Sequence, residues 1–420
     1  MKIDFTSLLA PLDCACGKRH TTDVRRVVME TDALSRLPEV IRELGDFSSI
    51  AMICDENTYA VAGKQVEYLC APDTVVILNP DGLHANEHSI KVAEAQLPDH
   101  LDLLIAVGSG TIHDITRYIT YGRKIQFISV PTAASVDGYV SNVAAMTLQG
   151  TKKTVIACAP IALVADLGII AAAPTRLTAS GVGDMLGKYT ALADWKIARR
   201  LTGEYYCPHV VDLMEQALAS VVAGLDRLQE NDVEATASLM YGLVLSGVAM
   251  QHTGVSRPAS GAEHHISHFI EVTMSDRCDA LHGEKVGVGM ILVSHLYHRF
   301  AALSNEQIQT GLSDYQTASD EEYGELFGVL APVLKQENTP DCALSVTVQT
   351  VLEHLSEIRS VIAELPPAEE LTALLSRCGA CTTLEEINLS SEELLPDLYH
   401  NAPLIRNRLT LMRLLRYFSW

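Results

Sequence analysis

The sequence has few residues of positive charge. Its 420 residues include 31 Lys and Arg against 52 Asp and Glu, which gives a formal net charge of −21. Proteins that bind nucleic acids or anionic membrane surfaces usually present a basic face, so this balance argues against both classes of partner. Aromatic residues are also scarce, at 5%, but hydrophobic residues make up 48% and charged residues 20%. These proportions are typical of a globular protein and argue against disorder as the main state.

Long uninterrupted apolar runs are missing as well. Residues 1–5 lead into no charged segment followed by an apolar stretch, so we expect no secretory signal and a cytoplasmic protein. The most apolar segment, 235–250, contains Gly242 and Gly247. It falls short of the roughly 18 uninterrupted apolar residues that indicate a membrane span. We therefore predict a buried helix there and no insertion into a membrane.

The ten cysteines form no complete metal-binding motif. Free thiols are the default state in a protein without a secretory signal. Cys14, Cys16 and His20 have the spacing of half a zinc site, but no second pair of ligands lies nearby in the sequence. Cys378 and Cys381 have the spacing of a redox pair, yet no strand precedes them. We therefore favour free thiols at both clusters.

Short apolar runs alternate with helical patterns over the first 170 residues. Continuous apolar runs of this length are typical of parallel strands buried on both faces. The helical patterns between them complete a β–α–β order and predict an open α/β sheet. The expected strands cover 50–54, 74–78, 101–107, 125–130 and 161–165, and the expected helices cover 85–97 and 111–120.

Long helical patterns replace this alternation after residue 174. We therefore predict two domains, a nucleotide-binding α/β domain over 1–174 and a helical domain over 175–420. The expected helices of the second domain cover 178–201, 210–229, 233–252, 261–274, 283–299, 344–365 and 401–420.

Two loops and one acidic residue follow predicted strands of the sheet. The turn 108–111 (Gly-Ser-Gly-Thr) opens a helix, and backbone N–H groups of such a turn can approach a phosphate closely. It lacks the third glycine of the dinucleotide-binding fingerprint, so chain geometry alone is the alternative explanation. Asp55 either binds the ribose of NAD or caps the following helix. The hydroxyl-rich loop 131–141 either lines a cofactor pocket or forms a polar turn.

Three segments of the predicted helical domain combine carboxylate and imidazole groups. Asp184 lies beside an apolar helical stripe, where a carboxylate needs a partner. His264 and His268 share one helix face because they are four residues apart, and His282 follows on the next predicted helix. One aspartate and two histidines suit zinc or another divalent metal with an open position for a substrate oxygen. Chance clustering is the alternative, since the chain has 15 histidines.

These motifs resemble the superfamily of iron-containing alcohol dehydrogenases and dehydroquinate synthases. Within it they resemble the sn-glycerol-1-phosphate dehydrogenase family most, and particularly its bacterial members. The segment SRPASG at 256–261 is specific to this family, whereas glycerol dehydrogenases differ there. The other shared motifs, which span most of the chain, are DENTYAVAG (55–63), GSGTIHD (108–114), PTAASVDGY (131–139), GVGDMLGK (181–188), ADW (193–195) and LHG (281–283).

The resemblance implies a dehydroquinate synthase-like fold and a set of ligand contacts. Asp184, His264 and His282 would bind the metal. Asp137 and His268 would be catalytic, and both would contact the substrate together with Asp184. Asp55 would bind the adenosine ribose, where its charge favours NAD(H) over NADP(H). The remaining cofactor contacts would be Gly108, Ser109, Gly110, Thr111, Ile112, His113, Asp114, Thr132, Ala133, Ala134, Ser135 and Ser141. His113 is a departure, because the family pattern carries a smaller amide there.

The implied activity is the NAD(P)-dependent interconversion of dihydroxyacetone phosphate and sn-glycerol 1-phosphate, with zinc, nickel or iron as the metal. A glycerol or other polyol dehydrogenase of the same fold is the alternative. A dehydroquinate synthase-like lyase is less favoured because the motifs hold few Lys and Arg, and a non-catalytic relative because the ligand set is complete. We expect a homo-oligomer whose partner is a small phosphorylated substrate. In so acidic a chain the phosphate needs local cations, and the candidates by sequence proximity are Lys188, Arg257 and Lys285.

Overall fold

The computed structural model describes residues 5–148, 151–313 and 315–420, and it divides into two compact units. Unit 1 comprises Met1–Gly181 and Leu213–Val255, and unit 2 comprises Val182–Asp212 and Ser256–Trp420. A segment from the middle of the chain therefore packs within unit 1. The assignment of cofactor binding to 1–174 and of metal and substrate binding to 175–420 stays a prediction.

The strands of the described residues all belong to unit 1. They are β1 (Leu12–Asp13), β2 (Arg19–His20), β3 (Arg26–Glu30), β4 (Ile50–Asp55), β5 (Thr74–Leu78), β6 (Leu103–Gly108), β7 (Gln126–Pro131), β8 (Val143–Leu148), β9 (Thr151–Ile156) and β10 (Ala162–Asp166). The helices of unit 1 are α1 (Thr6–Leu9), η1 (Ala33–Arg36), α2 (Leu37–Leu44), α3 (Glu56–Thr58), η2 (Tyr59–Gly63), α4 (Lys64–Cys70), α5 (Glu87–Glu94), α6 (Gly110–Arg123), η3 (Asp137–Val140), α7 (Leu167–Ala171) and α11 (Val233–Thr253).

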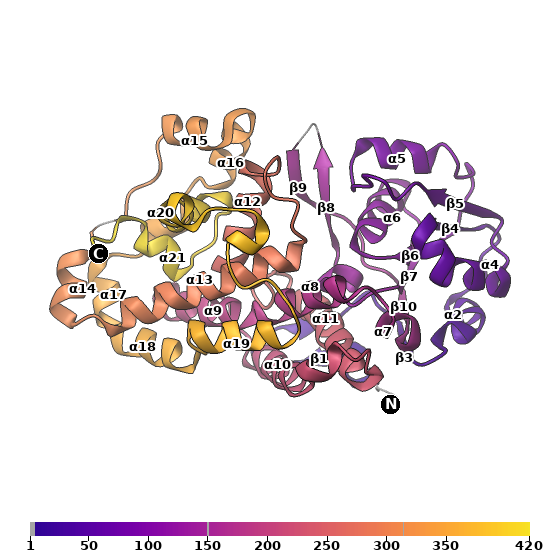
Figure 1. The fold of residues 1–420 in the computed structure, drawn as a ribbon, viewed down its shortest axis with the longest axis horizontal. Coiled ribbons are helices and arrows are strands. Elements are labelled where there is room, and N and C mark those ends of the chain that lie inside the picture. The colour runs from indigo at the N-terminus through magenta and orange to yellow at the C-terminus, as the bar shows by residue number, and fades with distance from the viewer. Residues whose placement is uncertain (1–4, 149–150, 314) are drawn as a thin grey trace. The chain divides into compact units, whose positions relative to one another are not determined.

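Six parallel strands form the main sheet of unit 1, in the order β3-β10-β7-β6-β4-β5 (Figure 1). From β4 the chain places β5 on one side and then β6 on the other. The direction in which the sheet grows therefore reverses between β4 and β6. At such a switch point the connections leave opposite faces and open a crevice at the carboxyl ends of the strands, where open α/β sheets bind ligands.

Strand side chains alternate between two apolar cores, one on each face of this sheet. Met52 and Ile105 belong to the core covered by α2 and α4. Ile53 and Ala106 belong to the core covered by α5 and α6. Every residue of β6 is buried, as expected for a central parallel strand. This layering confirms the predicted α/β sheet.

Three strand elements are missing from the prediction: the short hairpin β1–β2, the edge strand β3 and the hairpin β8–β9. The edge strand β3 has only three apolar residues between Arg26 and Glu30, and it is held in the sheet by parallel pairing with β10. The hairpin β8–β9 pairs antiparallel outside the main sheet. The hairpin β1–β2 and strand β3 are not long apolar runs, so apolar pattern alone does not reveal them. Strand β8 (VAAMTL) is apolar over most of its length, and the prediction omits it.

Unit 2 is largely helical, as predicted. Helices α8 (Thr175–Leu186) and α10 (Pro208–Leu228) each contribute residues to both units. The other helices of unit 2 are α9 (Lys188–Thr202), α12 (Ala262–Thr273), α13 (His282–Ala302), α14 (Asn305–Gly311), α15 (Asp320–Phe327), η4 (Gly328–Leu330), α16 (Ala331–Glu337), η5 (Cys342–Ser345), α17 (Val348–Glu353), α18 (Leu355–Glu364), α19 (Ala368–Arg377), η6 (Glu385–Ile387), α20 (Ser391–Asn401), η7 (Ala402–Ile405), α21 (Leu411–Leu414) and η8 (Leu415–Tyr417).

Two predicted helices are divided in the structure. The helix predicted over 178–201 is interrupted at Gly187, where a Cβ would lie 2.6 Å from Cγ1 of Val286. The close packing there requires a glycine, and glycine is a weak helix former. The helix predicted over 344–365 becomes α17 and α18, which meet at His354.

The prediction of one helix over 401–420 is wrong. The segment forms three short helical turns, η7, α21 and η8. Pro403 lacks the N–H that a helix needs beyond its first turn. Two side chains bind carbonyl oxygens that a continuous helix would use, since Arg413 donates to the oxygen of Pro403 over 2.6 Å and Asn338 donates to that of Leu404 over 3.0 Å.

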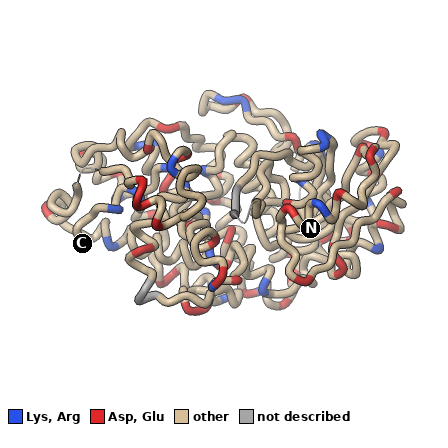
Figure 2. The backbone as a smooth tube through the Cα atoms, turned by 90° about the horizontal axis from the view of Figure 1, so that it is seen from above, with Lys and Arg blue, Asp and Glu red and all other residues tan. Residues whose placement is uncertain are grey.

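Taken singly, α11 is the one helix in the described part of the chain that is long and apolar enough to cross a membrane. Most of its apolar window is buried within the structure, as in the core helix predicted for 235–250. Acidic residues occur along both units, with fewer basic residues between them (Figure 2).

Candidate cofactor and metal sites

The predicted cofactor segments begin at one edge of the main sheet. Asp55, Gly108 and Pro131 end the neighbouring parallel strands β4, β6 and β7. Gly108 and Pro131 are paired in register, and the N–H of Thr132 donates to the oxygen of Gly108 over 3.1 Å. The turn after β6 and the loop after β7 therefore start side by side, next to the switch point of the sheet.

The glycine-rich turn leads directly into α6. Ser109 is the N-cap residue of this helix, but its side chain makes no capping hydrogen bond. The first N–H groups of a helix have no acceptor within the helix, and together with the helix dipole they favour an anion. A Cβ at Gly110 would lie 3.3 Å from Cγ2 of Val136, so the loop approaches the turn closely. This geometry suits the phosphate of a nucleotide.

Two side chains of the predicted phosphate turn have internal partners. The ring of His113 is buried, and its Nδ1 lies 2.9 Å from the oxygen of Ser109 while its Nε2 lies 2.8 Å from Oγ of Ser129. Burial lowers the pKa of His113 to about 3, so the ring is neutral. Asp114 pairs with the buried Arg117 over 2.9 Å. Both side chains therefore stabilise the fold, and the backbone N–H groups of the turn are the groups that can bind a phosphate.

The loop after β7 is held by a buried cation and several hydroxyls. Arg117 of α6 donates to the carbonyl oxygens of Gly138 and Val143. The hydroxyl of Tyr139 lies 2.9 Å from Oγ of Ser135 and donates to the oxygen of Ala133 over 2.6 Å. Thr132, Ala133, Ala134, Ser135 and Ser141, the predicted cofactor contacts of this loop, are all buried in the structure.

The two predicted carboxylates of unit 1 have different partners. Asp55 caps α3, because its Oδ1 accepts the N–H of Thr58 over 2.8 Å. The alternative of a helix cap is therefore realised, and binding of a ribose stays a prediction. Asp137 begins η3, and its Oδ2 accepts the hydroxyl of Ser246 from α11 over 2.8 Å.

The predicted metal ligands come together in unit 2. Asp184, His264 and His282 lie on α8, α12 and α13, and one donor atom from each lies within 4.8 Å of the others. Close backbone contact makes this possible, since a Cβ at Gly183 would lie only 2.1 Å from the carbonyl oxygen of Gly283. The helix that carries Asp184 therefore packs directly on the start of the helix that carries His282.

A carboxylate lies within hydrogen-bond distance of Nδ1 in each of the two imidazoles. Glu263 Oε1 lies 2.7 Å from Nδ1 of His264, and Glu271 Oε1 lies 3.0 Å from Nδ1 of His282. Each Nδ1 can thus donate its proton to a carboxylate, which leaves Nε2 with a lone pair. His264 Nε2 lies 3.8 Å from Oδ1 of Asp184. This is the arrangement that metal-binding histidines usually have, and the donor set fits a divalent cation.

The protonation states also suit a metal. Burial acts to raise the pKa of Asp184, but Lys188 and the two histidines outweigh it and hold that pKa below its usual range. Nζ of Lys188 lies 2.7 Å from Oδ1 of Asp184, and both side chains are fully buried. Burial and the charge of Lys188 lower the pKa of His264 well below its usual value. An ionised carboxylate and neutral imidazoles are the forms that bind metals.

His268 lies next to this cluster and shares a partner with it. The ring centroids of His264, His268 and His282 are 5.3 to 5.9 Å apart. Glu271 accepts from both His268 and His282, with 3.1 Å between its Oε2 and Nδ1 of His268. Donor atoms of His268, Glu271 and His282 also lie within 4.8 Å of one another, which is close enough for a metal. Both oxygens of Glu271, however, already accept hydrogen bonds from the two imidazoles.

The two glutamates behind the imidazoles are absent from the sequence prediction. Glu263 precedes His264 in the chain, and Glu271 follows His268 by three residues on the same helix. The i,i+3 spacing of His268 and Glu271 is a signal that could have suggested the second partner. The contact of Glu271 with His282 depends on the packing of two helices, so it has no local signal.

The three cations proposed for the substrate phosphate all have carboxylate partners. Each of the three side chains is also buried. Lys188 pairs with Asp184, Arg257 pairs with Glu204, and Lys285 lies 3.2 Å from Glu271.

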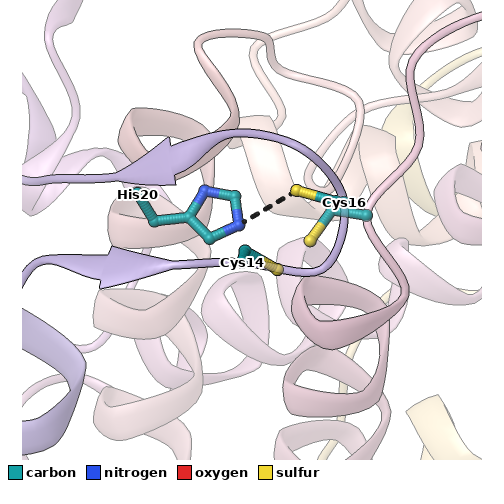
Figure 3. A group of neighbouring side chains, drawn as sticks. Cys14, Cys16 and His20 are labelled. Atoms are coloured by element: carbon teal, nitrogen blue, oxygen red, sulfur yellow. Dashed lines mark hydrogen bonds between the residues drawn. The ribbon is translucent and has the colours of Figure 1, made fainter.

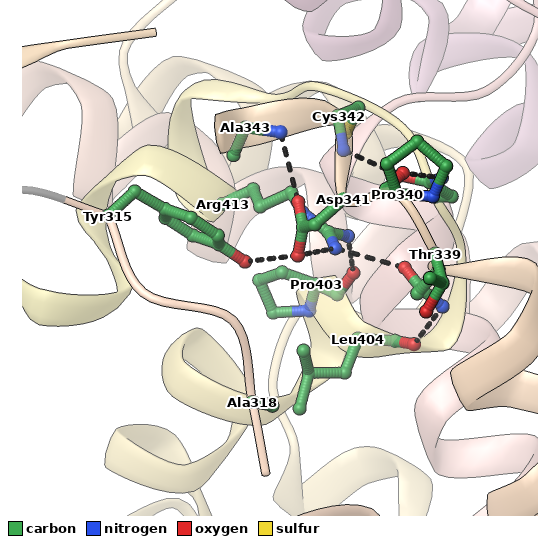
Figure 4. A network of polar contacts seen from close by, with 12 residues as sticks. Tyr315, Ala318, Thr339, Pro340, Asp341, Cys342, Ala343, Pro403, Leu404 and Arg413 are labelled. Atoms are coloured by element: carbon green, nitrogen blue, oxygen red, sulfur yellow. Dashed lines mark hydrogen bonds and ion pairs between the residues drawn. The ribbon is translucent and has the colours of Figure 1, made fainter. Parts of the chain in front are cut away.

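Arg406 is a further cation near the imidazoles. It follows η7, and its guanidinium forms no ion pair with any described residue. Burial lowers its pKa, and the charge of Glu337 acts to raise it. Its charge adds to the burial that lowers the pKa of His268, and η7 packs against α12, the helix of His268. Arg413 holds the Arg406 backbone by donating to its carbonyl oxygen over 2.9 Å. Arg413 is fixed in turn by Asp341 through two hydrogen bonds of 3.0 and 2.6 Å (Figure 4).

Known proteins resemble this chain in sequence and in fold. The family described as iron-containing alcohol dehydrogenase matches residues 28–174. A glycerol-1-phosphate dehydrogenase (NAD(P)+) of Geobacillus stearothermophilus is 34% identical over 410 residues, which cover 95% of this chain and 94% of the relative. Another from Bacillus velezensis is 40% identical over 310 residues, or 72% and 78% of the two chains. The crystal structure of glycerol dehydrogenase from Schizosaccharomyces pombe aligns with a TM-score of 0.59 at 16% identity, over 88% of this chain and 97% of that one. The predicted fold class is confirmed.

Proposed function

Because this chain belongs to the glycerol-1-phosphate dehydrogenase family, we propose that it interconverts dihydroxyacetone phosphate and sn-glycerol 1-phosphate. The reaction uses NAD(P)(H) and a divalent metal. The convergence of Asp184, His264 and His282, with a carboxylate behind each imidazole, is the observation that carries this proposal. Zinc, nickel and iron all suit this donor set.

The residues of unit 2 provide the metal site and a proton site. A bound metal would supply Lewis-acid polarisation of the C2 oxygen of the substrate, and bound NAD(P)(H) would supply or accept the hydride at C2. Asp184, His264 and His282 hold the metal in this proposal. His268 is about one-quarter exposed, and Glu271 accepts from its Nδ1. His268 is therefore oriented to hold or pass a proton at Nε2 as the substrate hydroxyl forms.

The residues of unit 1 bind the cofactor in this proposal. The N–H groups at the start of α6 bind its pyrophosphate, and Asp55 binds its adenosine ribose through the carboxylate oxygen that does not cap α3. Asp137 contacts the substrate, with its orientation fixed by Ser246. The loop residues 132–135 and Ser141 line the cofactor site.

The substrate phosphate binds Arg406 in this proposal. The guanidinium forms no ion pair in the described ranges 5–148, 151–313 and 315–420, unlike Lys188, Arg257 and Lys285, although the charge of Glu337 acts on it. Arg406→Ala should raise the KM for sn-glycerol 1-phosphate about tenfold to a hundredfold, the loss of a charged hydrogen bond. The exposed Arg277 is a matched control, and Arg277→Ala should leave that KM unchanged. Equal KM values for both variants would contradict the assignment of Arg406.

The activity is tested by following NADH oxidation with dihydroxyacetone phosphate. The metal-free chain is reconstituted with zinc, nickel or iron in separate samples, and the product is analysed for its chirality. We expect sn-glycerol 1-phosphate as the only enantiomer and little activity on glycerol. Faster turnover of glycerol than of its phosphate would instead support the polyol dehydrogenase alternative. No turnover of either compound with any metal would contradict the proposal.

A further inference from the structure

Two cysteines and one histidine come together in the N-terminal hairpin of unit 1. Strands β1 and β2 pair antiparallel, with Leu12 opposite His20. The turn between them is closed by two backbone hydrogen bonds of 3.0 Å, from Cys14 N–H to the Lys18 oxygen and from Gly17 N–H to the Cys14 oxygen. Gly17 has φ of +88°, a conformation that glycine adopts without strain. The turn brings both thiols to the ring of His20 (Figure 3).

The three donor atoms have the separations of a metal site. Sγ of Cys14, Sγ of Cys16 and a ring nitrogen of His20 all lie within 4.8 Å of one another. Sγ of Cys16 lies 3.5 Å from Nε2 of His20. Metal–sulfur bonds of about 2.3 Å and metal–nitrogen bonds of about 2.0 Å place ligand atoms of one tetrahedral ion at separations of this size.

The ring of His20 is oriented for metal binding. It is fully buried, and its Nδ1 lies 2.7 Å from the carbonyl oxygen of His252. A carbonyl oxygen can only accept, so Nδ1 carries the proton and Nε2 presents its lone pair toward Cys16. Metal-binding histidines are usually held in this way by a partner on the other ring nitrogen.

We propose that Cys14, Cys16 and His20 bind a zinc ion with a structural role. Thiolate and imidazole donors select zinc over the hard cations, whereas the Asp184, His264 and His282 cluster contains no sulfur. The two sets of donors therefore form chemically distinct sites. Zinc at the hairpin is independent of the dehydrogenase activity, and a tetrahedral ion takes a fourth donor besides these three.

The zinc site fastens the hairpin to the end of α11. Nζ of Lys18 donates to the carbonyl oxygen of Thr253 over 3.0 Å, and Oγ1 of Thr22 donates to Oε1 of Gln251 over 2.9 Å. With His20 bound to His252, the hairpin satisfies carbonyl groups of the last turn of α11, which a helix leaves without partners. Nε2 of Gln251 also donates to the oxygen of Val140 over 2.6 Å. The site thus supports the helix that holds the loop of Asp137.

Metal analysis of the complete chain, purified without a polyhistidine tag, tests the proposal. The variant His264→Ala removes a ligand of the unit 2 cluster and should still retain one zinc per chain. Adding Cys16→Ser to it should remove that zinc, whereas adding Cys70→Ser should not. Cys70 is a partly buried thiol of α4 outside the hairpin, so it is the matched control.

Cobalt spectroscopy of the His264→Ala chain is a second test. It keeps all the cysteines, so its result does not depend on whether a cysteine variant folds. Cobalt bound at the hairpin should show an intense near-ultraviolet band from thiolate-to-metal charge transfer. X-ray absorption of the zinc form should show at least two sulfur ligands and count the others. A metal-free His264→Ala chain, a metal without sulfur ligands, or a disulfide between Cys14 and Cys16 in the purified protein would each overturn the proposal.

Discussion

The two candidate sites for the reaction are built from different parts of the polypeptide. At the sheet edge of unit 1 the groups that can meet an anion are backbone N–H groups, and the side chains of His113 and Asp114 are turned to internal partners. In unit 2 the donors are the side chains of Asp184, His264 and His282. A backbone site survives side-chain changes that preserve the turn. A side-chain site loses its function when one donor is removed.

The largest expected effect is the loss of one donor in unit 2. His264→Ala removes an imidazole from the metal cluster and leaves Glu263 buried without that partner. We expect kcat to fall at least about a thousandfold, as is common when an essential electrostatic group is removed. His295→Ala changes an exposed histidine of α13 and should leave the rate unchanged. Steady-state kinetics and metal content check both variants, and full activity in a metal-free His264→Ala enzyme would contradict the mechanism.

A smaller effect is expected from alanine at the glycines of the two sites. In unit 2 a Cβ at Gly183 would meet a backbone oxygen at 2.1 Å, whereas in unit 1 a Cβ at Gly110 would meet a valine methyl group at 3.3 Å. Overpacking against backbone costs about 1 to 3 kcal/mol. Gly183→Ala should therefore lower the unfolding midpoint and the metal affinity, and Gly110→Ala should change stability less. Calorimetry and metal titration compare them, and a larger loss of stability in Gly110→Ala would reverse this ordering.

A still smaller effect separates two roles of Asp55. Asparagine can accept the same capping hydrogen bond from Thr58, but it lacks the charge. If the carboxylate binds the ribose of NADH, Asp55→Asn should raise the KM for NADH several-fold and leave the melting temperature almost unchanged. It should also improve the use of NADPH, because the repulsion of the 2′-phosphate disappears. An Asp55→Asn enzyme with wild-type KM values for both cofactors would leave Asp55 with the capping role alone.

The sequence predicts the two sites to different depths. The motif around Gly110 predicts a phosphate turn, because its chemistry comes from local backbone. The same reasoning does not show that His113 points into the fold, since its partner Ser129 lies on another strand. Asp184, His264 and His282 follow from helical spacing and family motifs. The contact of Glu271 with His282 depends instead on the packing of α12 against α13.

The fold is predictable where burial follows from local pattern. The central strands β4, β6 and β7 are mostly apolar, so their position and their parallel direction follow from the sequence. The edge strand β3 is short, and pairing with β10 decides its conformation. The segment 401–420 has a helical composition, yet side chains of Arg413 and Asn338 bind its carbonyl oxygens and keep it from forming one helix.

The smallest expected effect concerns the neutral ring of His113. Burial lowers its pKa from the ordinary value of 6.5 to about 3. Between these values the unfolded chain binds a proton at this residue that the folded chain does not. The free energy of unfolding therefore falls as the pH is lowered through this window. His113→Gln keeps polar groups near Ser109 and Ser129 but cannot take up that proton.

Urea unfolding of His113→Gln at pH 7 and pH 5 measures this effect. We expect the variant to lose less stability than the wild type between the two pH values, and the exposed His88→Gln to lose as much as the wild type. Activity at pH 7 should change little in both variants, because the phosphate turn offers its backbone N–H groups and not the imidazole. A large rise in the KM for NADH in His113→Gln, with unchanged stability, would instead make this side chain a direct contact of the cofactor and remove the contrast between the two sites.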